Sequence, residues 1–185
     1  MSLGEINQKN NGIGVAGTIQ LIGSQSISAN KASILFDNVP QSFNHLKIMG
    51  LARTDNGNTY DYLGLSFSGD YGNAHFAFQM FIGSSSTPSA TNSASFTYIE
   101  AGIIPGSTAT ASCGGPFVIN LPFYTNNTFF KNCSFIDGNN GATYCTFGTG
   151  QWFKSVTAPI NSITLQPGIG ANFVAGSQFS LYGIY

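Results

Sequence analysis

Residues 75–83 read His-Phe-Ala-Phe-Gln-Met-Phe-Ile-Gly, and this stretch decides the fold class. Phe76, Phe78 and Met80 alternate with smaller or polar residues. A period of two places the two sets of side chains on opposite faces of an extended chain. The stretch therefore predicts a β-strand with one face in a core and the other on solvent or on a neighbouring subunit.

The same kind of run recurs along the chain, separated by Gly, Asn, Asp and Pro. The 23 glycines and seven prolines leave no window with the apolar spacing of a helix. We predict an all-β fold, an antiparallel β-sandwich of jelly-roll type with about 8–11 strands. The expected strands are 18–27, 33–37, 45–53, 62–68, 75–83, 95–101, 115–121, 131–137, 142–147, 160–166 and 178–185.

The connecting segments define one domain and an arm. Asn56-Gly57 and Asn140-Gly141 are typical of tight hairpin turns, and the Ser-, Thr- and Pro-rich residues 83–92 predict a surface loop. Residues 18–185 are expected to form a single β-sandwich domain. Residues 1–17 form a Gly- and Asn-rich N-terminal arm with two interpretations, a frayed terminus or an extended arm that becomes ordered on a partner subunit.

Charged residues are scarce. The chain has six Lys and Arg and seven Asp and Glu among 185 residues, which is 7% charge and a net charge of −1. An ordinary soluble domain has about a quarter of its residues charged. Sparsely charged surfaces tend to associate, so we expect the protein to pack against copies of itself or against other subunits.

The composition argues against several classes of function. The chain has no basic excess to bind nucleic acid and no apolar run long enough to span a membrane. Its first ten residues do not resemble a secretory signal, so we expect it to be made in the cytosol.

Candidate catalytic groups are few. His45 and His75 are the two histidines, and no Gly-x-Ser-x-Gly segment surrounds a serine. Asp55, Asp61 and Asp70 cluster in sequence, but the segments around Asp55 and Asp70 are typical of turns. We expect no catalytic residues and a protein that is not an enzyme.

No cofactor or metal site is expected either. Residues 12–17 are glycine-rich, but no helix pattern follows them to bind a phosphate. Asp55, Asn58 and Asp61 offer oxygen ligands for a calcium ion, but their spacing does not fit the helix-loop-helix pattern, and the turn interpretation is favoured.

The three cysteines lack the spacing of a zinc site. With a two-residue turn at Asn140-Gly141, Cys145 would face Ile136 and Cys133 would face Gly148, which puts the two sulfurs on opposite faces of the hairpin. We therefore predict three free thiols, all of them small buried groups.

Aromatic residues are the remaining candidates for a ligand surface. Trp152, Tyr60 and Tyr62 are the possible glycan-binding or interface residues, although packing in the core or at a subunit interface is the favoured explanation for such residues. The wider set of candidates adds Tyr71, Tyr98, Tyr124 and Tyr144.

Two segments resemble a known domain. Residues 160–165 read Ile-Asn-Ser-Ile-Thr-Leu, residues 175–183 read Ala-Gly-Ser-Gln-Phe-Ser-Leu-Tyr-Gly, and residues 34–46 read Ile-Leu-Phe-Asp-Asn-Val-Pro-Gln-Ser-Phe-Asn-His-Leu. These segments resemble the closing and opening motifs of a β-rich domain of tailed-bacteriophage virion proteins. Together they bracket residues from about 33 to 184.

The resemblance implies a non-enzymatic structural protein of a phage virion, assembled in the bacterial cytoplasm. In that family the domain is usually a trimeric knob on a fibre, but these residues contain no shaft, coiled coil or repeat. We therefore expect a capsid decoration or cement protein, a homo-oligomer with a trimer favoured, that contacts the major capsid protein. The alternative is a tail-fibre or tail-associated knob that attaches to host surface glycans.

Overall fold

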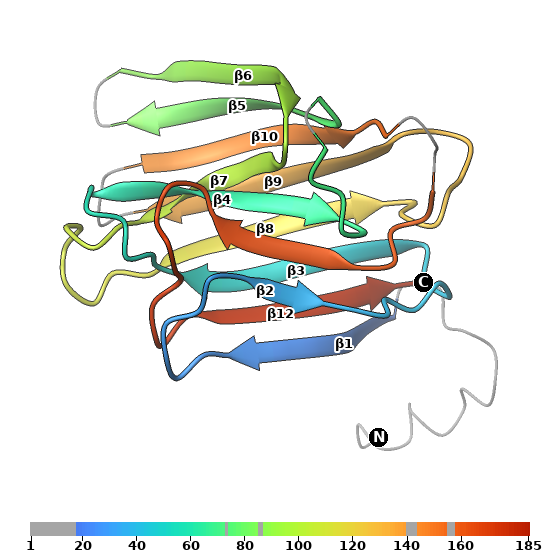
Figure 1. Ribbon diagram of the computed structural model, residues 1–185, viewed down its shortest axis with the longest axis horizontal. Helices are drawn as coiled ribbons and strands as arrows, with labels where there is room; N and C mark the ends of the chain where they lie inside the picture. Colours follow the sequence, from blue (N-terminus) through green and yellow to red (C-terminus); the bar gives the residue numbers. More distant parts are fainter. Residues whose placement is uncertain (1–17, 73, 85–86, 140–143, 155–157) are drawn as a thin grey trace, which may run out of the picture.

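The computed structural model describes residues 18–72, 74–84, 87–139, 144–154 and 158–185, in which every regular element is an antiparallel β-strand (Figure 1). The predicted all-β sandwich is confirmed. Its strands are β1 (Ile19–Ser26), β2 (Ile34–Phe36), β3 (His45–Ala52), β4 (Tyr60–Phe67), β5 (Phe76–Ser84), β6 (Ser89–Phe96), β7 (Ile99–Pro105), β8 (Gly115–Pro122), β9 (Lys131–Asn139), β10 (Tyr144–Trp152), β11 (Ile163–Pro167) and β12 (Gln178–Ile184).

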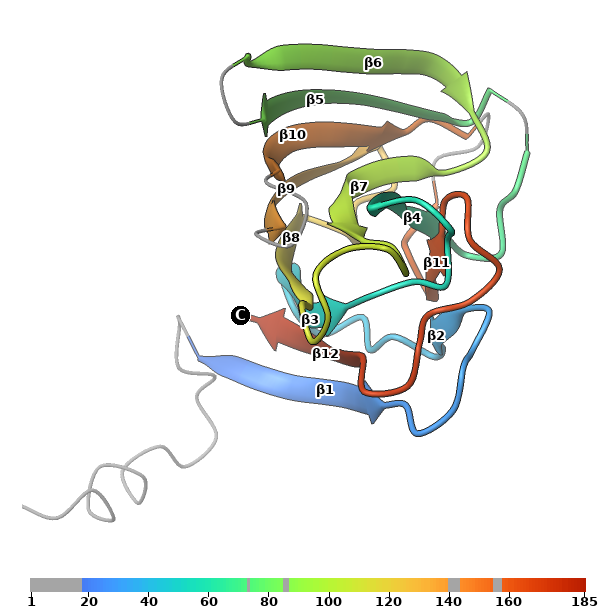
Figure 2. The same ribbon diagram turned by 90° about the vertical axis from the view of Figure 1, so that its left-hand side faces the viewer.

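The strands form two sheets of unequal size. The large sheet has eight strands in the order β1-β12-β3-β8-β9-β10-β5-β6, and the small sheet has four in the order β2-β11-β4-β7. Figure 2 shows that the large sheet curves around the small one. One face of the large sheet therefore covers the core, and its opposite face, called the outer face below, points away from the small sheet.

The core lies between the sheets and is rich in aromatic rings. Phe76, Phe78 and Met80 are buried, as the alternation in residues 75–83 predicts. The ring of Phe67 from β4 lies 6.3 Å from that of Phe76 and 5.7 Å from that of Trp152. Burying each of these side chains contributes on the order of 2 kcal/mol to folding, so these rings fasten the two sheets together.

The last strand alternates between buried and partly buried residues. Phe179 and Leu181 of β12 are buried, whereas Ser180, Tyr182 and Ile184 on the outer face are only partly buried. Within the described residues only the inner side of this strand is covered.

One strand was missed. Residues 83–92 were expected to form a surface loop, but Ser89–Phe96 pairs with β5 as the edge strand β6. Its sequence, Ser-Ala-Thr-Asn-Ser-Ala-Ser-Phe, has almost no bulky side chains because an edge strand buries little of its surface. The expected strand 95–101 is divided between β6 and β7, which brings the number of strands to twelve.

Of the two predicted Asn-Gly hairpin turns, one lies within the described residues. Asn56-Gly57 does not close a hairpin, because β3 and β4 belong to different sheets and residues 53–59 cross between them. Neither residue has a positive φ. The Asn140-Gly141 turn and the N-terminal arm 1–17 lie outside the described residues.

The three thiols are free, as predicted, but they are not all buried. Cys145 pairs with Gly138 and Cys133 with Gly150, a register two residues away from the expected one, because the strands end at Asn139 and resume at Tyr144. An even displacement keeps the two sulfurs on opposite faces. Cys133 is buried, whereas Cys145 is exposed and Cys113 is partly exposed, so their expected burial was wrong.

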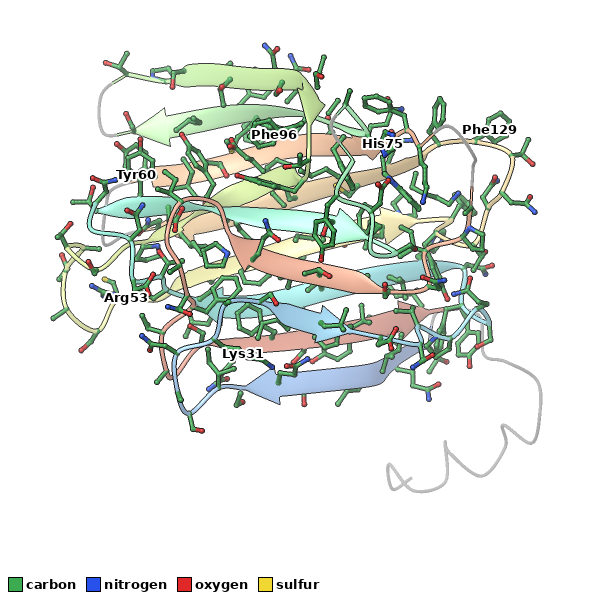
Figure 3. The ribbon with its side chains drawn as sticks, in the orientation of Figure 1. Lys31, Arg53, Tyr60, His75, Phe96 and Phe129 are labelled. Atoms are coloured by element: carbon green, nitrogen blue, oxygen red, sulfur yellow. The ribbon has the colours of Figure 1, made fainter. Side chains whose placement is uncertain are left out.

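Arg53 fastens the loop between β7 and β8, a role that sequence analysis did not find. Its guanidinium group donates to the carbonyls of Thr110 and Cys113 through Nη1, and to those of Ser107 and Ala109 through Nη2 (Figure 3). The planar group satisfies four carbonyls at 2.8–3.2 Å. The loop is thereby held by a charge rather than by apolar packing.

A substitution at Gly102 tests the packing between the two sheets. It has φ of 132° in β7, and a Cβ there would lie 2.4 Å from Oδ2 of Asp137 in β9. We expect Gly102→Ala to lower the free energy of unfolding by about 2–4 kcal/mol, measured by urea denaturation. The control is Gly57→Ala, which has open space around it and should change stability by less than about 1 kcal/mol. Equal effects of both changes would contradict this packing.

Candidate functional site

Trp152 lies in the core rather than on a binding surface. Its side chain is 2% exposed, and its indole N–H donates to Oδ2 of Asp70 at 2.7 Å. A sugar ring cannot reach it, so this part of the glycan-binding hypothesis does not fit the structure. Core packing explains the residue.

Tyr60 and Tyr62 form a partly buried aromatic group with Tyr144. The ring of Tyr60 lies 5.8 Å from that of Tyr62 and 5.0 Å from that of Tyr144. Burial, with Tyr60 nearby, raises the pKa of the Tyr62 hydroxyl to about 12. Tyr144 and Trp152 are at opposite ends of β10, about 27 Å apart in an extended strand. The three nominated aromatic residues therefore do not form one site.

His75 forms a pair with Asp70 at the end of the sandwich opposite to Tyr60 (Figure 3). Its Nδ1 lies 2.9 Å from Oδ1 of Asp70. Burial would raise the pKa of Asp70, but hydrogen bonds from Trp152, His75 and Gly72 outweigh burial and lower it. Among the described residues no hydroxyl or thiol is hydrogen-bonded to the His75 ring, so the pair has no adjacent nucleophile.

His45, the second histidine considered as a catalytic group, also has local partners. Its Nδ1 accepts the backbone N–H of Phe123 at 3.2 Å, and the two rings are 4.7 Å apart. The two histidines therefore have different partners and do not form one site.

Asp55 and Asp61 hold the loop between β11 and β12. Oδ1 and Oδ2 of Asp61 accept the backbone N–H groups of Ile169 and Gly170 at 2.8 and 2.9 Å. Both carboxylate oxygens of Asp55 accept hydrogen bonds from Asn172, which lower its pKa. The described residues contain no cluster of three His, Cys, Asp or Glu side chains that could hold a metal.

Asp137 and Glu100 are the two acids, among those in the described part of the chain, whose pKa is raised. Burial raises the pKa of Asp137 to about 6, although the Thr146 hydroxyl and the Ile103 N–H donate to its Oδ2. Its Oδ1 has no hydrogen-bond partner among the described residues. Burial and the nearby Asp61 raise the pKa of Glu100 to about 7. Both acids stabilise the fold best when they are protonated.

Exposed apolar side chains cross the outer face of the large sheet in register. Phe81 pairs with Phe147, Phe147 with Ile136, Ile136 with Val118, and Val118 with Met49. Four of them are 42–58% exposed, and the rings of Phe81 and Phe147 stack at 5.1 Å. We call these five residues, on five adjacent strands, the apolar row.

The outer face is almost without charge. Among the described residues of the eight strands, Lys47 is the one charged side chain that points outward, because Lys131 and Asp137 of β9 point into the core. Further exposed apolar side chains, Leu51 on β3 and Ile19 and Leu21 on β1, extend this surface. Such a surface has the character of a subunit contact.

A polar groove lies beside the apolar row, with a volume of about 520 Å³. Its rim carries amide and hydroxyl side chains from four strands, and its floor consists of small residues. The rim residues are Gln79, Asn92, Asn132, Thr149 and Gln151, and the floor includes Ala77, Ala94 and Gly150. The apolar row and the polar groove are the two functional candidates on this face, and neither was found from the sequence.

No family model, curated protein or solved structure matches this chain. The part of the chain that the structure describes contains no helical segment capable of crossing a bilayer.

The buried acids predict how stability depends on pH. A raised pKa in the folded state means that stability is greatest when the acid is protonated and falls as the pH rises from its unfolded value through its folded value. For Asp137 and Glu100 this window runs from about pH 4 to pH 7. We expect Asp137→Asn to raise the free energy of unfolding at pH 8 by about 1–3 kcal/mol and to have little effect at pH 4.

Chemical denaturation at several pH values measures this effect. Glu100→Gln is the matched control. It should remove the pH dependence of the free energy of unfolding only in the upper part of this pH window. A wild-type stability that increases from pH 5 to pH 7, or an Asp137→Asn variant less stable than wild type at pH 8, would show that the fold does not raise the pKa of Asp137.

Proposed function

We propose that this protein is a non-enzymatic structural component of a tailed-phage virion, a capsid decoration or cement protein that assembles through the outer face of its large sheet. The apolar row carries this proposal. Its five side chains would be costly to leave in water, and no part of the described chain covers them. The occupant of the face is a second copy of this chain.

The charge pattern favours a second copy over a charged partner. A strongly charged surface would find only Lys47 to pair with on the outer face, and its other charges would lose water without compensation. A sparsely charged surface on a second copy has no such cost.

The virion assignment is supported by the segments 34–46 and 160–184, which resemble phage virion proteins. A closed homo-oligomer, with a trimer favoured, would present identical surfaces to the repeating subunits of a capsid. Contact with the major capsid protein would then stabilise the head by mass action. The copy number tests this position, because a decoration protein should approach the abundance of the major capsid protein in purified particles.

The second candidate is a tail-associated knob that attaches to host glycans. The polar groove is the observation that favours it, because a knob needs a ligand site and a cement protein does not. A copy number far below that of the major capsid protein would select this candidate.

The mass of the purified protein tests assembly through the apolar row. We expect light scattering to give a multiple of the 19.5 kDa chain mass for the wild type, and a single chain for Phe147→Glu at micromolar concentration. A glutamate at the centre of a dry contact would be buried without a partner. Its dissociation constant should rise by about 100-fold or more.

Leu35→Glu is the matched control. Leu35 is 50% exposed, similar to Phe147, but lies on β2 of the small sheet. It should leave the mass unchanged. A wild-type protein that remains a single chain at 100-fold higher concentration, or a Phe147→Glu variant with the wild-type mass, would overturn assembly through this face.

A further inference from the structure

The polar groove has a defined structural origin. Its floor is low because Ala77 and Ala94 have short side chains. In addition, the register of β5 and β6 shifts between Phe76 and Phe78, which displaces the end of β6 relative to its neighbour. These two features create a hollow in a sheet surface that would otherwise be filled by side chains.

The rim residues lie in two rows that follow the sheet pairing. Asn92 faces Gln79, and Gln79 faces Thr149, in the first row. Gln151 faces Asn132 in the second row, about 7 Å further along the strands. The rows present hydrogen-bonding groups at the strand spacing of about 4.8 Å, which is close to the width of one sugar ring.

Hydrogen bonds within the protein orient the side chains of the second row. The Gln151 side chain donates through Nε2 to Oδ1 of Asn132 at 3.1 Å, and Nδ2 of Asn132 donates to the carbonyl of Phe130 at 3.3 Å. These bonds leave Oε1 of Gln151 as an acceptor and one N–H of Asn132 as a donor. A ligand would therefore meet a donor and an acceptor side by side whose positions are fixed before it binds.

We propose that the polar groove binds an uncharged, hydroxyl-rich ligand, a neutral oligosaccharide. Amides and hydroxyls both donate and accept hydrogen bonds, as sugar hydroxyls do. None of the groove residues is charged, so an anionic or cationic ligand would lose water without gaining an ion pair. The volume of about 520 Å³ suits a few sugar units.

The apolar row borders the groove but does not line it. Phe81 and Phe147 are two residues along their strands from Gln79 and Thr149, and other residues form the lining of the groove. This inference concerns a different set of residues from assembly, and it holds for either position on the virion.

A glycan microarray with neutral and anionic oligosaccharides, followed by isothermal titration with the strongest binder, tests the proposal with the full chain. We expect a neutral oligosaccharide to bind. The double variant Gln79→Ala, Gln151→Ala should weaken its binding about tenfold or more, because each change removes hydrogen bonds to the ligand.

Gln178→Ala is the matched control, since Gln178 is exposed on β12 outside the groove. It should leave binding unchanged. Thermal denaturation and light scattering should show that the double variant keeps the stability and mass of the wild type, which separates the groove from assembly. Absence of any neutral binder, preference for anionic glycans, or wild-type affinity in the double variant would each overturn the proposal.

Discussion

With so few charged residues, this protein uses several of its ionic groups inside the fold. Asp61, Asp70, Asp137 and Lys131 are buried, and Arg53 is committed to the carbonyls of one loop. The few charged groups thus hold loops and sheets together from inside. Little charge remains for the surface, and the outer face of the large sheet retains one outward-pointing charged residue among its described strands.

The central strands of the large sheet carry apolar side chains on both faces. On β9, Phe135 points into the core while Ile136 is 57% exposed, and on β8, Phe117 is buried next to Val118. This arrangement resembles a sheet inside a layered structure rather than one at its surface. A neighbouring copy would supply the missing layer, and the adjacent polar groove would remain a separate, ligand-binding part of the same face.

Strand alternation was sufficient to predict the sandwich, but it could not predict the functional face. In β10 the inward positions include Gly148 and Gly150, whose missing side chains are replaced by Phe135 and Ile99. The pattern therefore hides which side of this strand is the core, so Phe147 could not be recognised as exposed and Trp152 was considered for the surface. Cross-strand register, which creates the apolar row and the polar groove, depends on pairing between distant segments that a single sequence does not reveal.

Hydroxyl-radical footprinting of the wild-type protein can show whether copies cover the outer face, because it compares two rings of the same chemistry. Phe147 in the apolar row is 58% exposed in a single chain and Phe129 in the loop before β9 is 71% exposed. If the outer face is a contact between copies, Phe147 should be modified far more slowly than Phe129 in the assembled protein. Rates that differ only in proportion to these two exposed fractions would contradict the account.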